Sequence, residues 1–81
     1  MSTPLLAATL VHADRVRSFH VRPTFPAGWE ASESENQEVV HSQRQTDWHR
    51  VERTLLRFAQ QIAELKERGW REIELPPSRT R

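Results

Sequence analysis

The sequence contains no cysteine, only two glycines and no long apolar run. Without cysteine, disulfides and thiolate metal sites are excluded. Two glycines are too few for the glycine-rich loops that cradle nucleotide phosphates. No apolar run approaches the ~20 residues that a membrane-spanning helix needs. The short apolar stretch 5–11 has no positive charge before it, unlike a signal peptide. We therefore expect a cytoplasmic protein.

What remains is a short chain of ordinary composition. It has 81 residues, of which 36% are apolar and 28% are charged. A chain of this length forms one domain with a thin core, and its apolar content argues against wholesale disorder. We expect residues 10–75 to form a single domain, with a flexible N-terminus at 1–9 and a flexible C-terminal tail at 76–81.

The clearest pattern is that of a long amphipathic helix from Asp47 to Arg68. Six apolar residues follow the 3, 4, 3, 4, 3 spacing of one helical face. They are Trp48, Val51, Leu55, Phe58, Ile62 and Leu65. We expect three further residues to widen this face, namely Leu56, Ala59 and Ala63.

Both ends of this helix carry recognisable signals. Thr46 or Asp47 can accept hydrogen bonds from the free amides of the first turn. Gly69 follows the last turn and predicts a left-handed C-terminal cap, which would place Trp70 against Leu65.

The segments before the helix alternate between apolar and polar residues, as strands do. Residues 10–21 predict a strand with Phe19 and Val21 on one face. Arg22 to Gly28 contains two prolines and one glycine, so we expect a loop there.

Two further strands and a final one complete the prediction. Residues 29–33 and 38–45 predict a hairpin around a polar turn, with Trp29 and Ala31 on one face and with Val39 or Val40 facing inward. Residues 71–75 predict a last strand that turns Ile73 and Leu75 inward. The fold class is therefore α+β, with the order β-β-β-α-β. We expect a mostly antiparallel sheet of three to four strands, with the helix packed on one face.

The sequence does not predict a metal site or a catalytic site. No two of its four histidines stand at helical spacing on the predicted helix, although His20 and His41 could meet across adjacent strands. Ser18, His20 and Asp14 have the residue types of a nucleophile, a base and an orienting acid. Nothing in the strand pattern places them in a pocket. We expect no enzyme activity, no cofactor and no bound metal.

Charge is unevenly distributed along the chain, although the net charge is only +1. An acidic segment at 28–40 lies between two basic ones. Arg50, Arg53 and Arg57 form a basic stripe on the helix face away from the predicted core, where they could contact phosphates. The isoelectric point of about 8.6 is below that of a strongly basic nucleic-acid-binding domain, so the ordinary interpretation is a solvated arginine face.

These observations favour a small, non-catalytic protein–protein interaction or adaptor module, for which a homodimer is one form. Three tryptophans and three phenylalanines in a thin domain predict some exposed aromatic surface. Tryptophan and arginine often dominate protein interfaces, so we expect the contact surface at Arg22, Phe25 and Trp29. The alternative is a nucleic-acid-associated regulatory protein that uses Arg50, Arg53 and Arg57.

Overall fold

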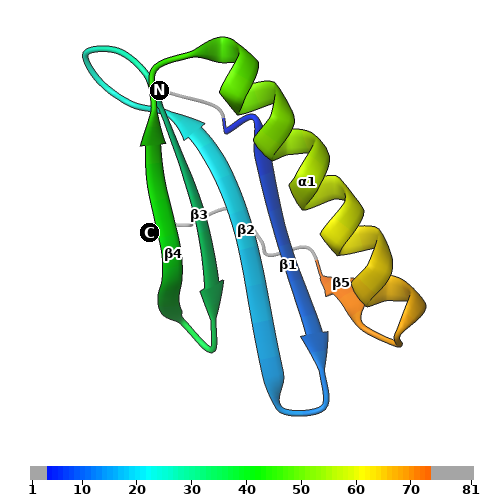
Figure 1. Cartoon of the computed structure of the whole chain (residues 1–81). Coiled ribbons are helices and arrows are strands. Elements are labelled where there is room, and N and C mark those ends of the chain that lie inside the picture. Colours follow the sequence, from blue (N-terminus) through cyan, green and yellow to red (C-terminus); the bar gives the residue numbers. More distant parts are fainter. Residues whose placement is uncertain (1–3, 74–81) are drawn as a thin grey trace.

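The computed structural model describes residues 4–73, which form one antiparallel sheet with a helix on one face (Figure 1). The strands are β1 (Leu6–His12), β2 (Arg15–Pro23), β3 (Trp29–Glu35), β4 (Glu38–Gln45) and β5 (Arg71–Ile73), and the helix α1 spans Trp48–Glu67. The strand order is β4-β3-β2-β1-β5. The first four strands are a meander, and α1 then carries the chain back so that β5 pairs with β1. The predicted α+β class and antiparallel sheet are confirmed.

Four strands precede the helix, whereas the sequence predicted three. The segment predicted as a flexible N-terminus and one strand is a hairpin of β1 and β2, and residues 6–9 belong to β1. Its tight turn is Ala13-Asp14, with Ala13 at a φ of 55°. A turn without glycine or asparagine carries little sequence signal. The small residues Ala7 and Thr9 also obscured the alternation of β1. The predicted tail at 76–81 lies outside the described residues.

The core lies between α1 and one face of the sheet. Cross-strand partners share a face, and the register aligns Ala8 with Phe19 and Val21 with Ala31. Phe19 meets Phe58 of α1 edge-on, with ring centroids 5.2 Å apart. The buried apolar residues are Ala8, Leu10, Phe19, Val21, Ala31, Val51, Phe58, Ile62, Leu65 and Trp70. The predicted pairing of Phe19 with Val21 on one face, and of Trp29 with Ala31, is confirmed.

The predicted helix ends are also confirmed. The Asp47 side chain accepts a hydrogen bond from the backbone N–H of His49 at 3.0 Å. At the other end, Gly69 has a φ of 100°. The Trp70 N–H donates to the Leu65 carbonyl at 3.0 Å, which is the bond of a Schellman cap. The cap brings the buried Trp70 ring into the same core cluster as Leu65.

The apolar face of α1 is narrower than predicted. Leu56 is 65% exposed, and Ala59 and Ala63 are exposed as well. Trp48, at the first position of the helix, is also exposed at 43%. A helix that lies on one side of a small sheet covers a single line of residues, so the positions beside that line remain in solvent. Thr54, which the pattern did not single out, is buried on this line.

Two predictions about inward-facing residues are wrong. Val39 and Val40 are 66% and 58% exposed, because β4 is an edge strand with a bulge opposite Glu33 and Ser34. In β5, Ile73 pairs with Thr9 and so lies on the sheet face away from α1. Glu72 lies on the helix side, where its carboxylate forms an ion pair with Lys66, with Oε1 2.8 Å from Nζ. Leu75 lies outside the described residues.

Candidate functional site

The loop between β2 and β3 is closed by its own hydrogen bonds. The Thr24 N–H donates to the Gly28 carbonyl and the Thr24 hydroxyl donates to the Ala27 carbonyl, both at 2.9 Å. Phe25 extends from the closed loop and is 93% exposed. Gly28 has a φ of 96°, and a Cβ there would lie 3.0 Å from the Gln45 carbonyl oxygen. The positive φ and the close approach to β4 therefore favour glycine at this position.

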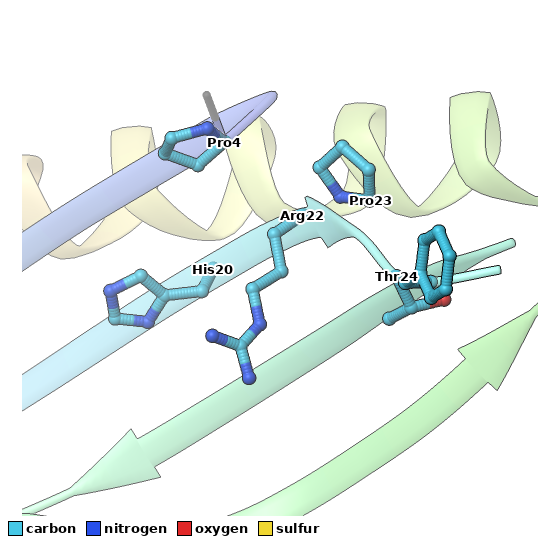
Figure 2. A pocket seen from close by; sticks show the side chains of 6 residues that line it. Pro4, His20, Arg22, Pro23 and Thr24 are labelled. Atoms are coloured by element: carbon cyan, nitrogen blue, oxygen red, sulfur yellow. The ribbon is translucent and has the colours of Figure 1, made fainter. Parts of the chain in front are cut away.

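A hollow of about 440 Å³ opens beside this loop. It is lined by Pro4, His20, Arg22, Pro23, Thr24 and Phe25, and Figure 2 shows these side chains around the end of β2. The Leu5 N–H donates to the Val21 carbonyl at 2.8 Å, which holds Pro4 next to β2. Pro4 was not predicted for this hollow, because its position depends on the pairing of β1 with β2. His20 lies two residues before Arg22 on β2, so strand alternation places both on the same face.

The structure brings together two of the three predicted partner-binding residues. Arg22 and Phe25 line the same hollow. Trp29 is not among the residues that line it, and it lies on the opposite face of the sheet from Arg22, since Arg22 pairs with Glu30 and successive residues of a strand point to opposite faces. Trp29 is partly buried against the core, with its ring centroid 5.3 Å from that of Trp48.

The charges beside the hollow sum to a positive value. Arg22 Nη2 donates to Glu30 Oε1 at 3.0 Å, and Ser42 donates to Glu30 Oε2 at 3.3 Å. Arg44 of β4 is the direct partner of Glu30 on the other side. One carboxylate therefore stands between two guanidinium groups, and the row carries one surplus positive charge.

The basic stripe predicted on the helix lies on the outer surface of α1. Arg50, Arg53 and Arg57 are all exposed, and none forms an ion pair with a carboxylate among residues 4–73. The Arg57 guanidinium lies 5.8 Å from the centroid of the Phe58 ring. The stripe thus presents three guanidinium groups that have no carboxylate partner within residues 4–73.

Two ion pairs link β2 and β3 on the helix side of the sheet. Arg17 pairs with Glu33, and Arg15 pairs with Glu35. The hydrogen bond from Arg15 is the largest influence on the pKa of Glu35 and holds it below its ordinary value of 4.5. Each carboxylate has its own arginine, so these groups brace the hairpin ends rather than form an acid–base pair.

The groups considered for metal binding and catalysis are dispersed in the described part of the chain. Residues 4–73 contain no group of three or more histidines, aspartates or glutamates that could hold a metal ion. His20 and His41 lie on strands separated by β3 and on opposite faces of the sheet. The Ser18 hydroxyl lies 3.4 Å from that of Thr9 and is not part of the hollow. Over the same residues, no helix has the length and apolarity to cross a membrane.

The free edge of β4 is the longest exposed strand surface in the described residues. All of its residues except Gln45 are exposed, and its described neighbour is β3 alone. At the opposite edge of the sheet, the described part of β5 spans only three residues. The sequence predicted the strand β4 but not its position at the edge.

Comparison with known proteins adds no further information on the site, since the sequence matches no protein-family model, no curated protein and no solved structure at a significant level.

Proposed function

We propose that this protein is a non-catalytic interaction module that works as a homodimer, and that two copies pair through the free edge of β4. The observation that carries the proposal is the exposure of this edge strand, including Val39 and Val40. The outward amide and carbonyl groups of an edge strand form a template for another strand. Pairing would also cover apolar surface of the two valines, which favours association.

The charges of β4 support a second copy as the partner. Glu38 is its first residue and Arg44 its seventh. In a two-fold symmetric antiparallel pair, the beginning of one strand lies beside the end of the other. The acidic end of each β4 therefore meets the basic end of its partner. The bulge interrupts the β3–β4 ladder at Val40, so we expect the hydrogen bonding between the two β4 strands to be irregular at that residue.

The test is the solution mass, measured by light scattering over a wide concentration range at low and moderate salt. We expect a species of twice the 9.5 kDa chain mass, with modest weakening in salt because the charged residues of β4 are exposed. A mass that stays at the monomer value throughout would refute the proposal. A larger or open-ended assembly would also refute it, because a two-fold pair is closed.

A second candidate function is nucleic-acid binding by α1. It is favoured by Arg50, Arg53 and Arg57, which are exposed on one side of the helix without carboxylate partners among residues 4–73. Contacts to phosphates release counterions, so the logarithm of the affinity falls linearly with the logarithm of the salt concentration.

This candidate is tested by titrating duplex and single-stranded oligonucleotides at several salt concentrations. Three phosphate contacts predict a log–log slope of about −2 to −3, and Arg53→Gln would reduce its magnitude by about 1. Arg44→Gln serves as the control, because Arg44 lies on the sheet and outside the stripe. Binding that does not depend on salt, or no binding at all, would eliminate this function.

A further inference from the structure

The hollow beside the β2–β3 loop combines a positive charge with an apolar rim, and we propose that it binds a small organic carboxylate with a flat apolar body. The carboxylate would bind to Arg22, and the apolar body would lie between Phe25 and the two prolines. This proposal concerns a different surface from the β4 edge, so either can fail without the other.

Two parts of the hollow, Pro4 and the loop backbone, are held by hydrogen bonds within the protein. Pro4 is fixed by the hydrogen bond between Leu5 and Val21, and the loop is closed by the two bonds that Thr24 donates. A site formed in advance loses less freedom on binding than one that must order. Its volume of about 440 Å³ is within the range of small-molecule pockets.

Arg22 has donors left for an anion. Its Nε and Nη2 atoms both donate to Glu30 Oε1, at 3.3 and 3.0 Å, while Nη1 makes no hydrogen bond within residues 4–73. Within residues 4–73, no carboxylate lines the hollow. The His20 ring lies on the same wall (Figure 2) and offers a further polar contact.

The rim explains why the ligand should have an apolar body. Phe25 is 93% exposed, and Pro4 and Pro23 also line the hollow. The Thr24 hydroxyl is already used by the Ala27 carbonyl, so the loop side offers an aromatic face rather than polar groups. A bare inorganic anion would leave this face uncovered, whereas a flat apolar group would cover it.

The experiment is a titration of the protein with three small-molecule probes, in which ¹H–¹⁵N correlation spectra are recorded at each ligand concentration. The probes are 3-phenylpropionate, its neutral analogue 3-phenylpropan-1-ol, and acetate. We expect 3-phenylpropionate to shift the backbone amides of His20, Arg22, Thr24 and Phe25 in a saturable way. Both the alcohol and acetate should bind more weakly, because the alcohol lacks the carboxylate and acetate lacks the apolar body.

Two arginines of the same row provide a matched pair of variants. Arg22→Gln should lower the affinity for 3-phenylpropionate about tenfold, the usual effect of losing a charge-assisted hydrogen bond. Arg44→Gln removes an equal charge outside the hollow and should weaken it by no more than about twofold. Phe25→Ala should weaken the acid and the alcohol alike. Native amide dispersion in each variant shows that the fold is intact.

Three results would overturn the proposal. The first is the absence of saturable shifts around the hollow with 3-phenylpropionate. The second is equal affinity for the acid and the alcohol, which would make the hollow an apolar crevice without anion recognition. The third is an equal loss of affinity in Arg22→Gln and Arg44→Gln, which would reduce the effect to general electrostatic attraction.

Discussion

Gln45 Nε2 donates a hydrogen bond to Thr54 Oγ1 at 3.1 Å, and both residues are buried where the end of β4 meets α1. Thr54 in turn donates to the Arg50 carbonyl at 3.0 Å. This contact ties the edge strand to the helix with a polar bond in an otherwise apolar interface. It also accounts for the burial of Gln45, whereas the seven residues before it in β4 are exposed.

We predict that Thr54→Val destabilises the protein although it preserves the side-chain shape. The change leaves the buried Gln45 amide without its partner, which costs about 1–3 kcal/mol in the free energy of unfolding. Urea denaturation with an unchanged m value measures this loss. Thr54→Ser keeps the hydroxyl and is the control, with a smaller loss from the missing methyl group. If the Thr54→Val variant were as stable as the wild type, the hydrogen bond would not contribute to stability.

A matched pair of lysine substitutions tests the proposed dimer surface. Val40→Lys should shift the mass toward the monomer, because a charge on an edge strand opposes strand pairing. Leu56→Lys should leave the mass unchanged. Leu56 is the suitable control because it is 65% exposed on α1, close to the 58% of Val40. Dimers that survive Val40→Lys but dissociate with Leu56→Lys would move the interface from β4 to the helix.

The two glycines should respond differently to alanine. Both have positive φ, at 96° for Gly28 and 100° for Gly69, so each substitution costs about 1–2 kcal/mol of conformational strain. At Gly69 the added Cβ would meet the His12 ring at an ordinary 3.5 Å. At Gly28 it would lie 3.0 Å from the Gln45 carbonyl oxygen. We therefore expect Gly28→Ala to lower the thermal midpoint more than Gly69→Ala. The reverse order would show that the loop moves away from β4 at little cost.

The Arg15–Glu35 pair should contribute to acid sensitivity. The pKa of Glu35 is lowered in the folded protein, chiefly by the hydrogen bond from Arg15. A group with a depressed folded-state pKa stabilises the fold above its unfolded-state pKa, and this contribution disappears as the pH falls through the folded-state pKa. As the pH falls below 4.5, the ordinary pKa of this carboxyl, we expect the free energy of unfolding to decrease more in the wild type than in Arg15→Gln.

Carbon-detected titration of the Glu35 carboxyl measures the same effect directly. Its pKa should return toward 4.5 in Arg15→Gln. Arg22→Gln, which removes the partner of Glu30, is the control and should leave the Glu35 pKa in place. An identical Glu35 titration in wild type and Arg15→Gln would contradict the assigned cause.

The helix was predictable because its signals are local. The spacing of Val51, Phe58, Ile62 and Leu65, the Asp47 cap and the Gly69 stop all act within a few residues of one another, and the structure confirms each. The exposure of Leu56 was not predictable in this way. It depends on how much of the helix a small sheet can cover, which is a property of the assembled fold.

The strands show the opposite behaviour, because their environment is set by distant residues. Val39 and Val40 are residues typical of buried strands, but they lie at the sheet edge. The spatial order of the strands cannot be predicted from any local pattern. The same limit applies to the hollow. Loop composition predicted Arg22 and Phe25, but Pro4 joins them only because β1 pairs with β2. Trp29 does not line the hollow, because its ring packs against the core beside Trp48, a tertiary contact that no local pattern predicts.

The pairing of β5 with β1 determines when the sheet can be completed during folding. The three hairpins of the meander close over short loops, whereas this pairing joins the first strand to the one that follows the helix, and contacts of such large sequence separation form slowly. Until α1 has docked, the outer edge of β1 remains unpaired. The folding protein thus carries an open edge at each side of its sheet, and arrival of β5 leaves β4 as the long free edge. Conditions that delay helix docking should therefore promote aggregation through β1, a strand that is fully enclosed in the native sheet.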